Sequence, residues 1–288
     1  MRTVVVTGTS TGIGYATARV LTQEGIHVFG SVRRPQDADR LRGEVGPLFR
    51  PLLFDVTDYA AVEDGAAQVS RHLNGQTLFG LVNNAGVAFP GPLLHLPIDD
   101  FRRQLEVNLI AQLFITQAFA SLLGTDDTRT GSPGRIVMMS SIGGRSASPF
   151  AGAYSASKFG MEGMSEALRR ELLMFGIDVV VIAPGAVATP IWDKVDTLDD
   201  GRLAHTRYAP ALKLAKDFSV ESGRRGLPAE TIGRTVLTAL TTPRPRTRYT
   251  VTPEPMKWLM GRLLPKRLVD RLIAKRLGWS RPRGSRHR

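Results

Sequence analysis

Tyr154 and Lys158 are four residues apart in the sequence. The segment around them, from Gly152 to Leu172, has apolar residues at helical spacing, which predicts one helix with both side chains on the same face. A tyrosine has a pKa of about 10, but an ammonium at about 4 Å would lower this pKa by roughly three units. The pair could then exchange a proton with an alcohol or a ketone. The alternative is a surface pair without chemistry.

A serine, Ser141, lies thirteen residues before the tyrosine, just after a strand predicted over residues 135–139. Parallel sheets present ligand-facing groups at the carboxyl ends of their strands. A hydroxyl there can donate a hydrogen bond to a developing alkoxide. Two other predicted strands end in small, polar or turn-forming residues, Asn83-Asn84-Ala85-Gly86 and Pro184-Gly185. We therefore expect three strand ends to face one crevice.

A glycine-rich turn follows the first predicted strand, residues 3–7, and a helical pattern follows the turn. Gly8 allows a tight exit from the strand, Gly12 lets the backbone approach a pyrophosphate, and Gly14 permits close helix packing. The amino end of the helix supplies free N–H groups and a positive dipole end. This order predicts a dinucleotide site, although a glycine-rich turn alone can be a mere tight turn.

The second predicted strand, residues 27–32, ends without the acid that holds the ribose 2′-hydroxyl in NAD-specific folds. Arg33 and Arg34 stand there instead, and their guanidinium groups could pair with a 2′-phosphate. We therefore predict NADP(H) as the cofactor, the alternative being two solvated arginines. Asp55, after the third strand, could accept a hydrogen bond from an adenine amino group or form a turn before Thr57.

Apolar runs rich in β-branched residues alternate with helical patterns along the chain, which indicates repeated βαβ units. The candidate strands cover residues 3–7, 27–32, 49–54, 78–83, 135–139, 178–183 and 248–252. They predict an α/β fold with a single Rossmann-type, doubly wound parallel sheet of about seven strands and helices on both faces. Pro51 cannot donate to a ladder, so the third strand should be an edge, as in the order 3-2-1-4-5-6. A long amphipathic helix is expected over residues 100–123.

In this order the motifs resemble the short-chain dehydrogenase/reductase family over residues 1–253. The shared residues are Thr7-Gly8-x3-Gly12-x-Gly14, Asp55, Asn83-Asn84-Ala85-Gly86, Asn108, Ser141, Tyr154-x3-Lys158 and Pro184-Gly185-x3-Thr189. The resemblance implies that Tyr154 is the general acid/base and that Lys158 lowers its pKa and binds the nicotinamide ribose. It makes Ser141, rather than its neighbour Ser140, the donor to the substrate oxygen, and Asn108 the holder of a water in the proton relay. From the residues alone, Asn108 could equally be a buried helix kink.

The resemblance also implies two sets of binding residues. The cofactor set is Gly8, Ser10, Thr11, Gly12, Ile13, Gly14, Arg33, Arg34, Asp55, Val56, Asn84, Ala85, Gly86, Tyr154, Lys158, Pro184, Gly185, Val187 and Thr189. The substrate set is Ser141, Gly143, Tyr154 and Trp192. NADP-dependent members often carry a basic residue before the middle glycine, where this chain has Thr11, so selectivity for the 2′-phosphate should depend on Arg33, with or without Arg34. No metal is expected, because the five histidines show no ligand spacing.

The segment from Ile191 to about Leu227 follows the sixth strand and mixes apolar and charged residues, as expected for a long substrate lid. This length and the residues around Tyr154 resemble the retinol and hydroxysteroid dehydrogenase branch, which implies a bulky apolar alcohol or ketone as substrate. A broad-specificity carbonyl reductase is the alternative, and a noncatalytic NADP-binding protein is a third. The resemblance further implies a homodimer or homotetramer paired through the helices over 100–123 and 152–172.

The net charge of +12 is concentrated at the carboxyl end: residues 257–288 carry eleven Lys or Arg against one acid, which leaves +2 for residues 1–256. A nearly neutral body argues against nucleic-acid binding. The absence of cysteine excludes disulfides and a catalytic thiol, and indicates a reducing, cytoplasmic location. No run of about 18 uninterrupted apolar residues is present, so no membrane-spanning helix is expected.

We therefore divide the chain into a catalytic domain, residues 1–256, and a basic amphipathic extension, residues 257–288. Two short helices split at Pro265 are expected over residues 257–279. An apolar stripe is formed by Leu268, Val269, Leu272 and Ile273, and basic residues occupy the other side. This pattern favours peripheral contact with an anionic membrane surface. The alternatives are packing on the domain itself, packing on a partner subunit, and a solvated tail.

Overall fold

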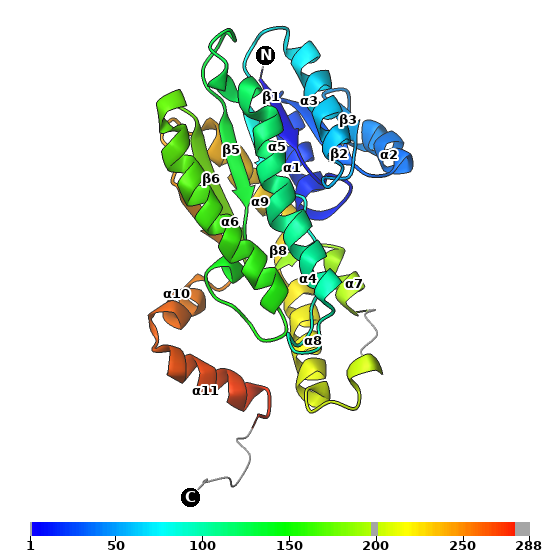
Figure 1. Ribbon diagram of the computed structural model, residues 1–288, viewed down its shortest axis with the longest axis vertical. Coiled ribbons are helices and arrows are strands. Elements are labelled where there is room, and N and C mark those ends of the chain that lie inside the picture. Colours follow the sequence, from blue (N-terminus) through cyan, green and yellow to red (C-terminus); the bar gives the residue numbers. More distant parts are fainter. Residues whose placement is uncertain (1, 197–200, 280–288) are drawn as a thin grey trace, which may run out of the picture.

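The computed structural model describes residues 2–196 and 201–279 and is built around one parallel sheet (Figure 1). The sheet has seven strands in the order β3-β2-β1-β4-β5-β6-β9. The strands are β1 (Thr3–Val6), β2 (His27–Val32), β3 (Phe49–Leu53), β4 (Gly80–Asn83), β5 (Arg135–Met139), β6 (Asp178–Pro184) and β9 (Arg248–Val251). The predicted fold class and strand order are confirmed, and Pro51 lies in the edge strand β3, where it pairs only toward Gly30 of β2.

Helices connect successive strands and cover both faces of the sheet. They are α1 (Gly12–Gln23), α2 (Pro35–Val45), α3 (Tyr59–Leu73), α4 (Ile98–Leu105), α5 (Ala111–Ala120), α6 (Gly152–Glu171), α7 (Ile191–Asp196), α8 (Ala209–Arg224), α9 (Ala229–Thr241), α10 (Pro255–Leu263) and α11 (Lys266–Arg276). A two-stranded sheet of β7 (Val187–Ala188) and β8 (Leu227–Pro228) spans the ends of the α7–α8 segment.

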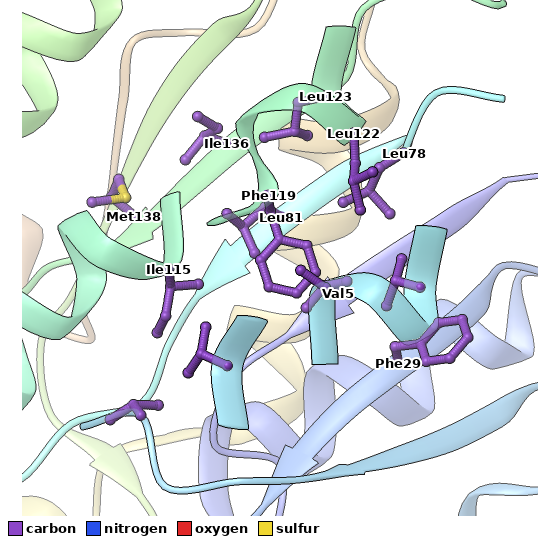
Figure 2. Close-up of a cluster of buried hydrophobic side chains, with 14 of the residues drawn as sticks. Val5, Phe29, Leu78, Leu81, Ile115, Phe119, Leu122, Leu123, Ile136 and Met138 are labelled. Atoms are coloured by element: carbon purple, nitrogen blue, oxygen red, sulfur yellow. The ribbon is translucent and has the colours of Figure 1, made fainter. Parts of the chain in front are cut away.

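Alternate strand residues point into two separate hydrophobic layers, as a pleated sheet requires. Val5 faces the layer formed with α3, α5 and α6, in which Phe119 is fully buried. Figure 2 shows this cluster, with side chains from the strands and from α5 meeting around Phe119. Val4 and Val6 face the opposite layer, where they join Leu21 of α1 and residues of α2 and α9. The two layers fix the sheet and therefore the position of every strand end.

The helix predicted over residues 100–123 begins at Ile98, and two π-helical segments, Glu106–Ile110 and Ser121–Thr125, interrupt it. Within residues 2–196 and 201–279, the helix Ile98–Thr125 is the one long and apolar enough to cross a bilayer. Half of its most apolar stretch is buried inside the protein, and the core helix of a soluble protein passes the same test. Its composition is therefore weak evidence for a membrane span.

The carboxyl-terminal helices α10 and α11 are separated at Pro265, as expected, and lie at the same end of the molecule as α8 (Figure 1). The predicted apolar stripe of α11 is divided: Val269 and Ile273 are partly buried, whereas Leu268 and Leu272 are exposed. Arg276 is exposed, and its guanidinium lies over the Phe218 ring of α8, 3.8 Å from the ring centre.

Candidate active site

The glycine-rich turn after β1 is held closed by the end of β4. Gly8 and Gly12 have positive φ angles of 70° and 62°, which glycine adopts without strain. A Cβ at Gly14 would lie 2.1 Å from the carbonyl oxygen of Gly8, so a side chain there would open the turn. The Asn84 amide donates to the carbonyl oxygens of Thr7 (2.8 Å) and Gly8 (3.2 Å). Asn84 therefore shapes the turn from within the protein.

The amino end of α1 is free of side-chain caps, because Thr11 makes no capping hydrogen bond. Its N–H groups are thus left to a ligand, and a helix amino end favours an anion. Thr189 lies across the turn, since a Cβ at Gly12 would be 3.4 Å from the Thr189 side chain. Ser10 and Ile13 belong to the same turn, and Val187 is buried in β7 close by in sequence. This cradle fits a pyrophosphate.

Two arginines follow β2, and they form different ion-pair contacts. Arg33 is 66% exposed and stands 3.8 Å from Asp55, a loose contact that leaves its guanidinium able to reorient. Arg34 instead pairs with Asp37 at 3.2 Å at the start of α2. The structure therefore leaves Arg33 as the better candidate for a 2′-phosphate.

A third arginine, Arg40 of α2, lies at this corner and was not anticipated from the sequence. Its guanidinium donates to the carbonyl oxygen of Ser10 at 2.7 Å and pairs with Asp37 and Glu44. The hydrogen bond with Asp37 raises the pKa of Arg40 above its ordinary value, opposed by burial. The i,i+4 spacing of Arg40 and Glu44 indicates a helix ion pair, and it does not reveal the contact with the turn.

Asp55 forms the turn after β3, which was one of the two interpretations left open. Its Oδ1 accepts hydrogen bonds from the main-chain N–H (3.0 Å) and the hydroxyl (2.8 Å) of Thr57. Partial burial tends to raise its pKa, but these bonds and the charges of Arg103 and Arg33 outweigh burial and lower the pKa. Asp55 is therefore ionised near neutrality, and Val56 beside it is buried.

The structure brings together Ser141, Gly143, Tyr154 and Lys158. Ser141 caps the short helix after β5, with its Oγ accepting from the Gly143 N–H at 3.0 Å. The Ser141 hydroxyl lies close enough to the Tyr154 hydroxyl to lower its pKa, and a Cβ at Gly143 would lie 3.4 Å from the Tyr154 ring. Lys158 Nζ donates to the carbonyl oxygen of Met139 at 2.8 Å and stands 5.8 Å from the centre of the Tyr154 ring. A proton donor and a hydrogen-bond donor therefore converge on one point.

The expectation that Lys158 lowers the pKa of Tyr154 is not met in this structure. Burial raises the pKa of Tyr154 above its ordinary value, and only the hydrogen bond with Ser141 opposes the rise. Burial also lowers the pKa of Lys158 from 10.5 to about 8. The sequence argument placed the ammonium beside the tyrosine oxygen in partly aqueous surroundings, whereas desolvation dominates both groups here.

Asn108 lies in the first π-helical segment, and its side chain is fully used. Its Oδ1 accepts from the Val87 N–H at 2.8 Å, and its Nδ2 donates to the Val87 carbonyl (3.0 Å) and to Ser157 Oγ (3.1 Å). The amide thus joins the loop after β4 to α6 at the residue before Lys158. These contacts match the buried, bonded kink of the sequence interpretation, and a water held by Asn108 stays a prediction.

Glu162 of α6 lies next to the site residues, and the sequence analysis did not identify it as part of the site. Its carboxylate accepts from Ser140 Oγ at 2.9 Å, Arg145 Nε at 3.0 Å and Arg248 Nε at 3.0 Å. The side chains of Glu162 and Arg248 are only 11% and 10% exposed. Ser140 is thereby turned toward Glu162, which supports the assignment of Ser141 to the substrate side. The sequence signal that could have identified Glu162 is its position four residues after Lys158, one turn further along the same helix.

The remaining predicted residues lie at the ends of β4 and β6. A Cβ at Gly8 would lie 2.9 Å from Ala85, and one at Gly86 would lie 3.3 Å from Asn108 Oδ1. The carbonyl oxygen of Pro184 is 3.5 Å from Ser141 Oγ, and the Gly185 N–H donates to Val251.

Trp192 makes contacts within the lid itself. Its Nε1 donates to the Val187 carbonyl at 2.8 Å, and its ring packs on Gly223, where a Cβ would lie 2.2 Å from ring atoms. The contacts tie α7 to α8, and a substrate contact by Trp192 stays a prediction.

An apolar cover stands beside the start of α6. It is formed by Phe150, Leu203, Tyr208, Ala211, Leu212 and Ala215, with Leu277 packed against them. The rings of Phe150 and Tyr208 are perpendicular, with centres 6.1 Å apart. Phe150 precedes Tyr154 by four residues, so the chain leads from this cover directly into the helix that carries Tyr154. The lid predicted over residues 191–227 includes most of it.

Comparison with known proteins agrees with this geometry. Residues 2–199 match the family described as short chain dehydrogenase. The NADPH-dependent 3-dehydrocapnine reductase of Ornithobacterium rhinotracheale is 36% identical, over 96% of this chain and 98% of that protein. Human retinol dehydrogenase 5 is 33% identical, over 94% of this chain and 87% of that protein. A crystal structure of a short-chain dehydrogenase from Streptomyces avermitilis superposes with a TM-score of 0.74 at 24% identity, over 96% and 95% of the two chains, and shows the same fold.

A dinucleotide cradle, a tyrosine–serine pair over a buried lysine, and a family match over most of the sequence agree with one another. The chain is an oxidoreductase that belongs to the short-chain dehydrogenase/reductase family.

Proposed function

We propose that the protein uses NADP(H) to interconvert a secondary alcohol and a ketone, or an alcohol and an aldehyde, on a bulky apolar substrate. The observation that carries the proposal is the approach of Ser141 and Tyr154, whose side chains both lie against Gly143, with the apolar cover that includes Phe150 at the start of the same helix. A carbonyl oxygen at this pair would have a proton donor and a hydrogen-bond donor, and its apolar remainder would contact the cover.

Each residue has a distinct role in the proposed reduction. The nicotinamide, when bound, supplies the hydride that reaches the carbonyl carbon. Tyr154 donates its hydroxyl proton to the carbonyl oxygen while Ser141 donates a hydrogen bond to the same oxygen, so an alcohol and a tyrosinate result. Lys158, which holds a proton below its pKa of about 8, then returns a proton to the tyrosinate and is itself reprotonated from solvent water. Alcohol oxidation is the same sequence in reverse.

The cofactor preference is assigned to NADPH on the exposed guanidinium of Arg33 and the absence of an acid at the end of β2. The name of the Ornithobacterium relative, an NADPH-dependent reductase, supports this choice. Arg33→Asp should move the ratio of kcat/KM for NADPH over NADH toward NADH by about tenfold or more, because a charge-assisted pair is replaced by repulsion. Arg34→Asp is the matched control, since Arg34 is already paired with Asp37. Equal use of both cofactors by the unmodified protein would contradict the assignment.

The substrate class is assigned on the cover and is supported by the name of human retinol dehydrogenase 5. A series of ketones, from small to steroid-sized, tests it by following the absorbance of the reduced nicotinamide. We expect kcat/KM to increase with apolar bulk, because each buried methylene adds about 0.8 kcal/mol. A flat series would instead indicate a broad-specificity carbonyl reductase. Turnover of none of the ketones or corresponding alcohols would contradict the proposed reaction.

We also propose that the protein is a homodimer or homotetramer through the outer faces of α5 and α6. Ile110 and Leu113 before and within α5, and Phe159 of α6, are 47%, 37% and 46% exposed. These apolar side chains lie on the two helices expected to pair. Sedimentation equilibrium of the full chain should therefore give an assembly that Phe159→Asp dissociates.

A further inference from the structure

An outward row of apolar side chains runs along α10. Met256, Leu259, Met260 and Leu263 follow one another at intervals of three, one and three residues, which places them on one face of a helix. They are 68%, 45%, 54% and 75% exposed. Trp258, on another side of α10, lies instead against the Arg248 guanidinium, 5.7 Å from it. The helix therefore packs on the protein with one face and leaves its apolar row uncovered.

The next helix extends this uncovered surface. On α11, Leu268 and Leu272 are four residues apart and are 40% and 52% exposed. The inner side of α11 is already occupied: Leu277 packs in the apolar cover, and Trp279 meets the Phe150 ring at 5.9 Å. The inner contacts fix the orientation of α11, so Leu268 and Leu272 cannot turn inward without losing them. We call these six side chains on α10 and α11 the apolar rim.

Basic groups accompany the apolar rim. Lys266, Arg267, Arg271 and Lys275 of α11 are exposed. In the described ranges, the side chain of none of these four forms a salt bridge or a hydrogen bond. Residues 257–288 as a whole carry eleven basic residues and one acid. An unpaired basic helix beside exposed apolar side chains matches the chemistry of an anionic lipid surface.

We infer that α10 and α11 dock the protein onto the surface of an anionic membrane. The apolar rim enters the boundary between headgroups and acyl chains, and the four basic side chains of α11 contact the lipid phosphates and carboxylates. Helices of 9 and 11 residues are far shorter than the about 20 residues that cross a bilayer, so they lie in the interface. The inference rests on the surface alone and does not depend on the proposed reaction.

Docking in this orientation has a structural consequence for the cover. Leu277 and Trp279 connect α11 directly to Phe150, and Arg276 lies over the Phe218 ring of α8. The docked helices and the cover are therefore parts of one packed unit.

Cosedimentation of the full chain with lipid vesicles tests the inference without substrate or cofactor. Vesicles of phosphatidylcholine with phosphatidylserine should bind the protein, and vesicles of phosphatidylcholine alone should bind it at least about tenfold more weakly. Leu263→Asp combined with Leu272→Asp should lower partition onto the mixed vesicles about tenfold or more. Replacing Lys266, Arg267, Arg271 and Lys275 by glutamine should lower it similarly and remove its dependence on salt.

Leu173→Asp with Met174→Asp is the matched control, because these side chains are 67% and 81% exposed after the end of α6, outside the apolar rim. The control should bind vesicles as the unmodified protein does, and thermal melting should show every variant folded. Equal binding by all variants, or binding that ignores phosphatidylserine and salt, would overturn the inference. So would absence of vesicle binding together with dissociation of an oligomer by Leu263→Asp and Leu272→Asp, which would assign the rim to an interface between copies.

Discussion

At the residue scale, desolvation sets the properties of the reacting groups. Lys158 is buried, its Nζ donates a hydrogen bond to the carbonyl oxygen of Met139, and its pKa falls to about 8. Burial raises the pKa of Tyr154, so its hydroxyl is protonated near neutrality in this structure. A protonated tyrosine is the form needed to donate a proton to a carbonyl oxygen.

Tyr154→Phe should lower kcat by about 10²- to 10⁴-fold, because the variant lacks the acidic proton. Fluorescence titration with NADPH should give a dissociation constant close to that of the unmodified protein. Tyr249→Phe, which removes a hydroxyl that accepts from the Arg246 N–H, is the control and should retain activity. A Tyr154→Phe variant with more than about a tenth of the original kcat would contradict the assignment.

The buried lysine also gives a pH-dependent stability. Below pH about 8 Lys158 is protonated in both the folded and the unfolded state. Burying its positive charge then lowers the stability of the fold by the full cost of desolvation. Between about 8 and 10.5 the unfolded chain binds more proton than the folded one, so stability contributed at this site rises with pH. Between about pH 8 and 10.5, the free energy of unfolding of the unmodified protein should therefore rise by roughly 3 kcal/mol relative to that of Lys158→Met.

Urea unfolding at a series of pH values measures this difference. Lys213→Met, at an exposed lysine of α8, is the control for general effects of removing a positive charge. A difference between the unmodified protein and Lys158→Met that stays constant from neutral to alkaline pH would show that burial does not disfavour the ammonium.

The reacting residues could be predicted from their spacing in the sequence, but the directions of their pKa shifts could not be predicted. The helical interval of Tyr154 and Lys158, and the position of Ser141 after a strand, identify the group. The direction of the Tyr154 pKa depends on burial, which arises from segments far away in sequence. The same holds for the contact of Arg40 with the carbonyl oxygen of Ser10, which is 30 residues away in sequence.

At the element scale, Glu162 joins three pieces of the fold. The carboxylate on α6 binds Ser140 after β5 and Arg248 at the start of β9. Because both charges of the Glu162–Arg248 pair are largely buried, removing one leaves the other without compensation. This pair therefore couples the last strand of the sheet to the helix that carries Tyr154.

Glu162→Gln should lower the free energy of unfolding by roughly 3 kcal/mol, and the double variant with Arg248→Met should lose less than the sum of the single changes. Urea unfolding of all four proteins of the cycle gives the coupling. Glu166→Gln, which disrupts an exposed pair with Arg170 on the same helix, should cost less than about 1 kcal/mol. Additive losses in the cycle would show that Glu162 and Arg248 act separately.

The order of elements could be predicted because strand patterns and Pro51 are local signals with a topological meaning. The π-helical segment around Asn108 could not be predicted from such local signals. It depends on hydrogen bonds to Val87 and Ser157, which are 21 and 49 residues away in sequence. Apolar periodicity predicts a continuous helix across such a segment, since a π segment changes the register by a single residue.

At the scale of the whole molecule, the carboxyl-terminal helices and the cover form one unit. Leu277, just after α11, packs with Phe150 and Leu212. Trp279, two residues further along, contacts the Phe150 ring. The sequence pattern showed an amphipathic helix but gave no means of dividing its apolar residues between protein and surroundings. Packing of distant segments decides that division.

Leu277→Ala with Trp279→Ala should raise KM for a steroid-sized ketone about fivefold, because the cover loses apolar support. KM for a small ketone and kcat for both should change little, since Tyr154 and Ser141 do not contact these side chains. Steady-state kinetics on the two ketones measures the effect. Leu173→Ala is a control at an exposed site. Equal changes for both ketones would show that α11 does not support the cover.

The pairing of the first and ninth helices determines when this chain can fold during its synthesis. The backbone of α9 approaches α1 closely, with a Cβ at Gly233 only 3.0 Å from the Ala16 carbonyl oxygen. Chains emerge from the ribosome amino end first, so α1 lacks its α9 neighbour until more than two hundred residues later. The sheet likewise ends with β9, whose Arg248 completes the contacts of Glu162. Nascent chains that stop before β9 should therefore expose apolar surface and depend on chaperones, whereas the full chain can close both layers at once.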